Sequence, residues 1–411
     1  SENVAVGFGA LEDCTTGVRN TAIGMEAGRN LTTGDNNIAI GRNTMDGVVT
    51  GDWNTAVGNE ALKANTGGAN NVAVGNALID NTTGNQNTAM GNSALSSNTT
   101  ASYNSAFGNL ALNNNTTGAD NTAVGHNALT ANTTGERNTA VGDNALDANT
   151  TASYNVAVGR DALGSNTTGA NNTSIGTYAL DANTTGVSSV AVGYAALLAA
   201  TTASDNVAVG KESLRANTTG EWNVAVGRLT LKTQTTANFN TAVGDIAGYD
   251  ITTGGNNLVL GYESGRSGSP SGQITTGSNS ICLGNNSIAN LYCADTSISS
   301  SDSRDKTDVT NFTHGLNWIN QLNPITYRWD KRSWYDDNTP DGSKKRNKKH
   351  IGFLAQDVLA IEGNPTNKDD MLVVNLNEDD TAYGLKYERL VPVLVNAIKE
   401  LSAKVAALEA A

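Results

Sequence analysis

A five-residue phrase recurs along most of this chain at a nearly constant interval. It reads Asn-Val-Ala-Val-Gly at residues 3–7 and returns with small changes as far as Asn-Ser-Ile-Cys-Leu-Gly at residues 279–284. The interval is seventeen residues, with one step of sixteen and a last step of twenty-three. The glycines that close the phrase are Gly7, Gly24, Gly41, Gly58, Gly75, Gly91, Gly108, Gly125, Gly142, Gly159, Gly176, Gly193, Gly210, Gly227, Gly244, Gly261 and Gly284. A fixed period over this length predicts a stacked repeat architecture.

Each slot of the repeat has an assignable structural role, as residues 138–151 illustrate. Residues 139–141, Thr-Ala-Val, alternate β-branched side chains with alanine, which is typical of a strand whose two faces differ. Residues 145–146, Ala-Leu, add a second short apolar step, and residues 149–151, Asn-Thr-Thr, are typical of a turn. Asn-Thr-Thr also fits the glycosylation acceptor pattern, but we interpret it as a turn. The repeat predicts a mostly β chain, built as a β-solenoid with seventeen-residue coils.

The slot before the strand is asparagine in nearly every coil, as at Asn20, Asn37 and Asn54. Coils stacked at roughly 4.8 Å would place these amides within hydrogen-bonding distance of one another, as in the amide ladders of cross-β structures. Seventeen such steps predict a rod on the order of 80 Å long.

One copy of such a rod buries little apolar surface. From the alternation of the strand, each coil is expected to bury one Val or Ile and one Leu, worth roughly 1.5 to 3 kcal/mol apiece. Ordering costs about 1.5 kcal/mol for each residue, which indicates that partner chains contribute. Alanine on the opposite strand face, as at Ala5, Ala22 and Ala39, would let another backbone approach closely. We therefore expect parallel copies packed alanine face to alanine face, most simply as a closed homotrimer.

Composition and charge exclude several classes of function. The chain carries 39 acidic and 26 basic side chains, a net charge of −13, so binding to nucleic acid is not expected. Its three cysteines, Cys14, Cys282 and Cys293, are scattered, which favours small buried thiols over a disulfide framework. No apolar run is long enough to span a membrane. The Gly-Gly-x-Gly-x-Asp pattern of calcium-binding repeats is absent, and no metal or other cofactor is expected.

Aromatic side chains are rare in the repeat. Trp53, Tyr103, Tyr154, Trp222 and Phe239 are candidate receptor contacts, because exposed aromatic rings on a rod can stack on sugars. The alternative is that they are turn residues that cover the edge of a coil.

The repeated phrase resembles the Asn-Ser-Val-Ala-Ile-Gly repeats in the haemagglutinin-type heads of trimeric bacterial autotransporter adhesins, and similar repeats in phage tail fibres. The resemblance covers about the first 290 residues and implies a trimeric, left-handed parallel β-roll. Because the coil here is longer than the usual adhesin repeat, a shaft of three interleaved chains is an alternative arrangement.

The composition changes near residue 295, where tryptophan, proline and charge become as frequent as in an ordinary globular domain. We predict a repeat shaft over residues 1–294, a linker over residues 295–300 and a small α+β domain over residues 301–411.

Local patterns indicate several elements in this domain. Residues 316–322 fit a short helix and residues 325–329 fit a strand. The basic residues within 344–349 are interpreted as a solvated loop rather than an anion-binding patch. Within residues 390–411, apolar residues are spaced 3, 4, 3, 4 and 3 apart, at Val391, Leu394, Ile398, Leu401, Val405 and Leu408. This heptad seam predicts a coiled-coil helix that associates within the trimer, the alternative being a helix packed on its own domain.

Several ordered motifs carry a second resemblance. Residues 301–306 read Ser-Asp-Ser-Arg-Asp-Lys, residues 322–329 read Leu-Asn-Pro-Ile-Thr-Tyr-Arg-Trp, and residues 351–358 read Ile-Gly-Phe-Leu-Ala-Gln-Asp-Val. With Tyr-Glu-Arg-Leu at residues 387–390 and the terminal helix, this order resembles the C-terminal intramolecular chaperone domain of phage endosialidases and other tail fibres. The resemblance implies a domain that trimerises, templates the upstream β-structure and cuts itself off with a serine and a lysine.

Carried over to this sequence, the resemblance assigns Ser301 as the nucleophile, Lys306 as its base and Asp302 as a supporting residue. Ser301 would attack the carbonyl of Ser300, so the Ser300–Ser301 bond would break. Lysine acts as a base only when neutral, so trimerisation would have to bury Lys306. Asp305 stands where the family more often has an apolar residue, and its carboxylate could keep Lys306 protonated. The alternative for this segment is a capped turn at the start of the domain.

Together, the two resemblances imply a phage tail or side fibre whose homotrimeric shaft attaches the virion to a glycan or protein receptor on the host surface. The fibre would contact other virion tail proteins, would be assembled in the host cytoplasm and would act outside the cell without inserting into a membrane. The alternatives are a bacterial trimeric surface adhesin and the non-catalytic part of a polysaccharide depolymerase. No coil departs enough from the repeat to hold a catalytic insertion, so self-cleavage is the one enzymatic step expected.

Overall fold

The computed structural model describes residues 2–288, 306–335, 337–376 and 382–410. The chain forms two compact units. The first comprises Ser1–Ser264 and Thr275–Leu283, and the second comprises Gly265–Ile274 and Gly284–Ala411. The predicted linker at residues 295–300 lies outside the described residues.

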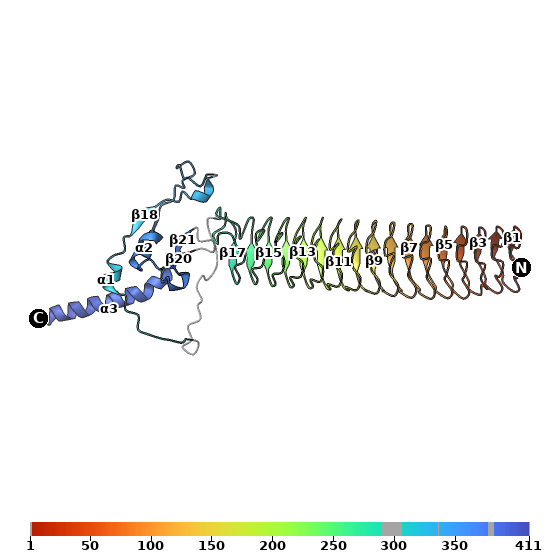
Figure 1. Cartoon of the computed structure of the whole chain (residues 1–411), viewed down its shortest axis with the longest axis horizontal. Coiled ribbons are helices and arrows are strands. Elements are labelled where there is room, and N and C mark those ends of the chain that lie inside the picture. Colours follow the sequence, from red (N-terminus) through yellow and green to blue (C-terminus); the bar gives the residue numbers. More distant parts are fainter. Residues whose placement is uncertain (1, 289–305, 336, 377–381, 411) are drawn as a thin grey trace. The chain divides into compact units, whose positions relative to one another are not determined.

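The first unit is a 17-stranded sheet in which each coil contributes one strand of three residues. Every strand pairs in parallel with the strand of the next coil, so the strands stack in chain order along a rod (Figure 1). The strands are β1 (Val4–Val6), β2 (Thr21–Ile23), β3 (Ile38–Ile40), β4 (Thr55–Val57), β5 (Val72–Val74), β6 (Thr88–Met90), β7 (Ser105–Phe107), β8 (Thr122–Val124), β9 (Thr139–Val141), β10 (Val156–Val158), β11 (Thr173–Ile175), β12 (Val190–Val192), β13 (Val207–Val209), β14 (Val224–Val226), β15 (Thr241–Val243), β16 (Leu258–Leu260) and β17 (Ile281–Leu283). The predicted β-solenoid with seventeen-residue coils is confirmed.

The middle residue of each strand points into its own coil. In β8 and β9 the register pairs Ala123 with Ala140, and both side chains are fully buried. The flanking Thr122 and Val124 point outward because successive residues of a strand face opposite sides. The prediction of inward-facing Val or Ile and an outward alanine face is therefore wrong. The middle position is alanine in most strands and a larger residue, such as the buried Val259 of β16, in few, so most of the β-branched side chains lie on the outer surface.

The Ala-Leu step completes the apolar interior of the coil. Ala128 and Leu129 are both fully buried. Leu129 has a φ of 56°, in the left-handed region that residues other than glycine and asparagine rarely adopt. Burying the leucine side chain is worth roughly 1.5 to 3 kcal/mol, which offsets a conformational cost of about 1 to 2 kcal/mol.

The asparagines that precede the strands form a buried ladder, which we call the first asparagine column. Oδ1 of Asn121 accepts a 2.9 Å hydrogen bond from the backbone N–H of Asn138, one coil later. Nδ2 of Asn121 donates a 2.9 Å hydrogen bond to the carbonyl of Gly135 in the turn. In this coil Nδ2 of Asn138 also donates to Oδ1 of Asn121, over 3.2 Å. The predicted amide ladder is confirmed, and it also ties each strand to the neighbouring turn.

A second asparagine column was not predicted. It contains the asparagine of the Asn-Thr-Thr turn, as at Asn132, which is fully buried. Nδ2 of Asn132 donates to Oδ1 of Asn115 over 2.8 Å and to the carbonyl of Gly135 over 3.0 Å. The hydroxyl of Thr133 donates to the carbonyl of Thr150 in the next coil. The burial of Asn132 agrees with the interpretation of Asn-Thr-Thr as a turn, because a folded coil does not present this amide for glycosylation.

The second unit contains short helices and two antiparallel strand pairs, β18 with β19 and β20 with β21. Its elements are α1 (Leu316–Ile319), β18 (Ile325–Tyr327), η2 (Arg332–Trp334), β19 (His350–Gly352), α2 (Ala355–Ile361), η3 (Lys368–Asp370), β20 (Val374–Leu376), β21 (Tyr383–Leu385), η4 (Tyr387–Arg389) and α3 (Leu390–Glu409). Its core contains Trp318, Val358, Met371, Val373, Val374, Leu390 and Val393. The predicted helix at residues 316–322 and strand at residues 325–329 are present in shorter form.

Helix α3 presents two different apolar faces. Leu390, Val393 and Ala397 are buried within the unit. All six residues of the predicted heptad seam are exposed, namely Val391, Leu394, Ile398, Leu401, Val405 and Leu408. The alternative of a helix packed on its own unit therefore holds for the face that carries Leu390, Val393 and Ala397, whereas the seam is exposed in the single chain.

Candidate functional site

The five aromatic residues singled out from the sequence occupy the same slot of the coil. Trp53, Tyr103, Tyr154, Trp222 and Phe239 each directly precede a residue of the first asparagine column. Because the coils stack in constant register, this slot forms a line along the surface of the rod, which we call the variable column. All five side chains are between 48 % and 62 % exposed. The structure therefore places the five candidates on one face of the first unit.

The variable column combines chemical diversity with an unusual backbone. Its described members are Arg19, Asn36, Trp53, Asn70, Gln86, Tyr103, Asp120, Arg137, Tyr154, Asn171, Ser188, Asp205, Trp222, Phe239, Asn256 and Asn279, all with φ between 54° and 65°. Asparagine is among the residues that tolerate this left-handed conformation best, whereas bulky side chains adopt it rarely. Exposed aromatic rings here gain little from burial and carry a backbone cost, a combination that is concentrated at functional sites. The column is accordingly the best candidate for a recognition surface.

Tyr154 is paired with an arginine of the preceding coil. The guanidinium carbon of Arg137 lies 5.4 Å from the centroid of the Tyr154 ring, and the guanidinium donates a hydrogen bond to the phenol oxygen. Arg137 also pairs with Asp120 across 3.7 Å. The hydrogen bond to Tyr154 raises the pKa of Arg137 above its ordinary value, and Asp120 supplies the opposite charge beside the guanidinium.

Trp222 and Phe239 stack on each other in successive coils. Their ring centroids lie 5.1 Å apart and their planes differ by 4°. The coil repeat therefore holds two aromatic rings face to face at the surface.

A second group of aromatic and basic side chains was missed from the sequence. The rings of Tyr178 and Tyr194 meet edge to face with centroids 6.2 Å apart. Arg160 lies 4.6 Å from the Tyr178 centroid, and Lys211 lies 5.8 Å from the Tyr194 centroid. The available signal was their common position, one or two residues after the glycine that ends a strand.

Two carboxylates flank a glycine in another column of the rod. A Cβ built on Gly164 would lie 2.9 Å from Oδ1 of Asp181 and 3.4 Å from Oδ1 of Asp147. Burial raises the pKa of Asp147 and of Asp181 above their usual values, and repulsion from Asp161 raises both further. The glycine leaves the space that the two carboxylates share.

The predicted self-cleavage site lies mostly outside the described residues. Ser300, Ser301, Asp302 and Asp305 all fall in the segment that the structure does not describe. Lys306 is described and is exposed in the single chain. The pairing of Ser301 with Lys306 therefore stays a prediction.

The basic segment at residues 344–349 meets several aromatic rings of its own unit. Nζ of Lys344 lies 5.1 Å from the centroid of Tyr335, and the guanidinium carbon of Arg346 lies 4.8 Å from the centroid of Trp334. Lys331 lies between Trp329 and Trp334, and burial lowers its pKa, with a further contribution from Arg346. The exposed cations agree with a solvated loop, although some of them also stack on rings.

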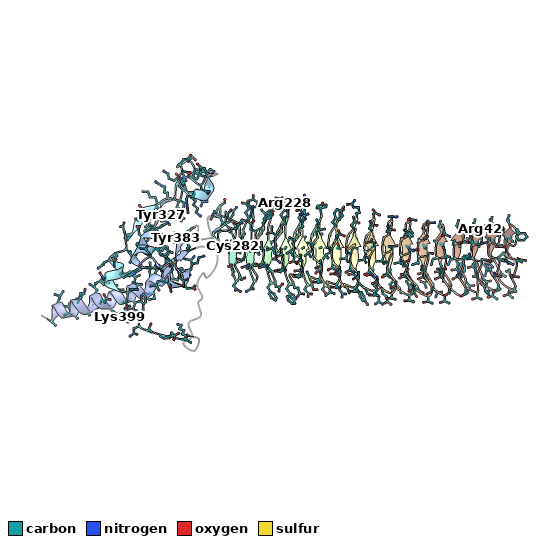
Figure 2. All side chains as sticks on the ribbon, in the orientation of Figure 1. Arg42, Arg228, Cys282, Tyr327, Tyr383 and Lys399 are labelled. Carbon is teal, nitrogen blue, oxygen red and sulfur yellow. The ribbon has the colours of Figure 1, made fainter. Side chains whose placement is uncertain are left out.

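Among residues 2–288, 306–335, 337–376 and 382–410, no helix is long and apolar enough to cross a bilayer. No three His, Cys, Asp or Glu side chains of these residues cluster as metal ligands. Cys282 is buried in the middle of β17 and Cys14 is half-buried, and both are thiols. Figure 2 shows Cys282 on the line of strands and Arg228 at the outer edge of the coils.

Comparison with known proteins finds a similarity over part of the chain. A family model described as the chaperone of endosialidase matches residues 301–366. No curated protein and no solved structure matches the chain. The match supports an intramolecular chaperone domain at the C-terminal end of a β-solenoid shaft.

Proposed function

We propose that the chain is a phage tail or side fibre, a homotrimer that acts outside the cell and attaches the virion to a glycan or protein receptor on the host. The observation that carries this proposal is the joining, in one chain, of a β-solenoid to a segment that matches the endosialidase chaperone. The repeats also resemble those of adhesin heads and tail fibres. Assembly takes place in the host cytoplasm, and the fibre contacts other tail proteins in the virion.

The need for a chaperone follows from the sameness of the coils. Most coils offer their neighbour the same strand register and the same two asparagine columns, as the pairs Asn121 with Asn138 and Asn115 with Asn132 illustrate. Copies aligned one coil out of register would satisfy most of the same contacts. Parallel, non-local β-structure also folds slowly and exposes edges while it forms. A C-terminal trimer removes this ambiguity by fixing the alignment before the coils close.

Two exposed apolar surfaces suit association with further copies. The third strand residue of many coils is an outward aliphatic side chain, such as Ile23, Val124 and Ile175, each about 40 % exposed. The second surface is the seam of α3, which includes Leu394 and Leu401. Three copies joined through these third strand residues and through the α3 seam would cover both surfaces and leave the first strand residues outside the contact. This arrangement takes the place of the alanine face expected from the sequence.

The chaperone domain releases itself once after assembly. Oγ of Ser301 attacks the carbonyl carbon of Ser300 and passes its proton to the neutral amine of Lys306. The peptide bond to the nitrogen of Ser301 breaks, that nitrogen takes the proton, and water then hydrolyses the resulting ester. Release after alignment would leave the shaft kinetically trapped in its correct register.

The proposal is tested by intact mass spectrometry of the full chain and of a Ser301→Ala variant. We expect a fragment that begins at Ser301 from the unaltered chain alone. The released shaft should remain trimeric by light scattering and should bind at least one of a panel of bacterial cell surfaces. A monomeric shaft that binds none of the panel would contradict the proposed attachment role.

A further inference from the structure

We propose that a groove beside Phe239 binds one pyranose unit of a neutral glycan. The inference rests on the proposed attachment function and names the class of receptor that the variable column recognises.

The groove has a volume of about 420 Å³. One side is lined by three successive members of the variable column, Phe239, Asn256 and Asn279. The other side is lined by the first residues of three successive strands, namely Thr241, Leu258 and Ile281. Pockets that hold small ligands have volumes of roughly 300 to 1,000 Å³, so the groove is large enough for a single sugar ring.

The Phe239 ring offers one of its faces to this groove. Its other face stacks on Trp222, which does not line the groove. Phe239 is 56 % exposed, and its backbone has a φ of 62°. The Trp222 ring below it restricts the orientation of Phe239, so a flat ligand meets an aromatic surface that is already positioned.

Room for the ligand arises from a change of side-chain size within the column. After Trp222 and Phe239, the next two members are the short Asn256 and Asn279. A third aromatic ring would continue the stack at this point, whereas the asparagines leave the space above them open. A sugar ring placed there would take the position of that third ring.

Polar groups on both sides of the groove suit sugar hydroxyls. Nδ2 of Asn256 donates a 2.7 Å hydrogen bond to Oδ1 of Asn279, which holds the two amides in a fixed orientation. An amide group has two donor hydrogens and two acceptor lone pairs, so each asparagine keeps capacity for a ligand hydroxyl. The hydroxyl of Thr241 adds a group that can donate or accept. An aromatic face beside paired amides matches a pyranose, which has an apolar face and a rim of hydroxyls.

The absence of charge decides between classes of glycan. None of the side chains that line the groove is charged, and Leu258 and Ile281 contribute apolar surface. By contrast, the Tyr154 ring of the same column has the Arg137 guanidinium placed over it. We therefore assign neutral sugars, rather than acidic ones, to the groove at Phe239.

The test uses the full chain and the methyl glycosides of glucose, galactose, mannose and N-acetylglucosamine. Binding is measured by saturation-transfer NMR with the unaltered chain, Phe239→Asn and Asn256→Trp. Asparagine tolerates the left-handed backbone at Phe239, and tryptophan occupies the same slot at Trp222, so both variants are expected to fold. Tyr262→Asn is the matched control, because Tyr262 is as exposed as Phe239 and lies outside both the groove and the variable column. Asparagine occupies the same slot in other coils, as at Asn92.

We expect at least one glycoside to bind the unaltered chain and Tyr262→Asn, with affinity lowered by roughly tenfold or more in both groove variants. The proposal is overturned if no glycoside binds the unaltered chain, or if Tyr262→Asn loses as much affinity as Phe239→Asn. It is also overturned if Phe239→Asn lowers the trimer mass, because another copy would then occupy the groove. Binding to immobilised bacterial surface polysaccharides is measured in parallel. If Phe239→Asn retains that binding in full, the groove is excluded while the attachment function stands.

Discussion

The backbone N–H of Asn138 donates to the amide oxygen of Asn121, one coil earlier, and Asn138 in turn accepts from the backbone of Asn155. This relationship repeats along the rod, so each coil satisfies a buried donor of the next. The interior of the solenoid is therefore held by polar columns as well as by alanine and leucine. The stability of the solenoid therefore depends on the register of these asparagine columns.

Asn121→Ala should destabilise the shaft by about 1 to 3 kcal/mol, the cost of leaving one buried polar group unsatisfied. The substitution leaves the N–H of Asn138 without its acceptor. The carbonyl of Gly135 keeps its bond from Asn132, so the loss is limited to one orphaned group. Chemical denaturation of the purified chain measures the change. Asn114→Ala, at an exposed position of the neighbouring coil, should be nearly neutral, and equal losses in the two variants would contradict the role of the buried column.

Gly125→Ala should prevent normal stacking of the coils. Gly125 has a φ of 138°, and a Cβ at this position would collide with the carbonyl of Gly142 in the next coil. Gly67→Thr is the matched control, because the nearest atom to its Cβ would be Cγ2 of Thr83 at 3.8 Å. The Gly67→Thr substitution also introduces the threonine that most other coils have in this slot. We expect loss of soluble, β-rich protein by circular dichroism for the first variant alone. A soluble and fully folded Gly125→Ala chain would show that coil spacing is not set by this glycine.

Asp147→Asn and Asp181→Asn should stabilise the shaft at neutral pH. Each folded carboxyl has a pKa above its ordinary value of 3.8, so the folded chain binds more protons than the unfolded chain in the window above pH 3.8. Stability from these groups is therefore greatest below that window and is lost as the pH rises through the folded pKa. We expect a higher melting temperature for both variants at pH 7 and no difference near pH 3. Asp80→Asn is the control, because it removes the same charge at an exposed site. An equal rise in melting temperature for Asp80→Asn would show that the lower net charge, and not the burial of the carboxyl groups, stabilises the shaft.

Ile175→Glu should weaken association of the copies, because it places a charge on the outward strand face that we propose they share. Ile175 is 41 % exposed in the single chain, so the substitution creates no buried charge within one copy. Thr185→Glu, in the exposed turn of the same coil, is the control. Analytical ultracentrifugation should show dissociation or aggregation of the first variant and an unchanged species for the second. Identical behaviour would move the interface away from the strands.

Most of the shaft could be predicted because its period is written directly in the sequence. The glycines, the three-residue strands and the first asparagine column all follow from the seventeen-residue interval. The direction of the strand faces could not be read from the alternation of Thr139, Ala140 and Val141, because either face could line an interior. The deciding factor is the width of the coil, which is filled by Leu146, small alanines and two asparagine columns. The space that these side chains leave inside the coil is known only from the folded structure.

The candidate sites were predictable to different degrees. Trp222 and Phe239 could be chosen as candidate receptor contacts because aromatic residues are rare in the repeat. Their stacking and the groove beside them depend on which residues follow in the same column. Asn256 lies seventeen residues after Phe239, so the relationship appears once the coils are aligned. The assignment of Ser301 and Lys306 depends on family resemblance, because single residues without a repeated context carry no geometric signal.

The most direct test of the central claim is the mass in solution of the full chain and of a fragment limited to residues 1–294, measured by light scattering. The chain has a mass of 42.4 kDa, and we predict a full-length assembly of three times that mass, or three shafts if cleavage has occurred. The fragment alone should aggregate or give rods of mixed alignment, because its coils cannot select a register. A monomeric full chain, or a fragment that forms uniform trimeric rods as readily as the full chain, would contradict the account.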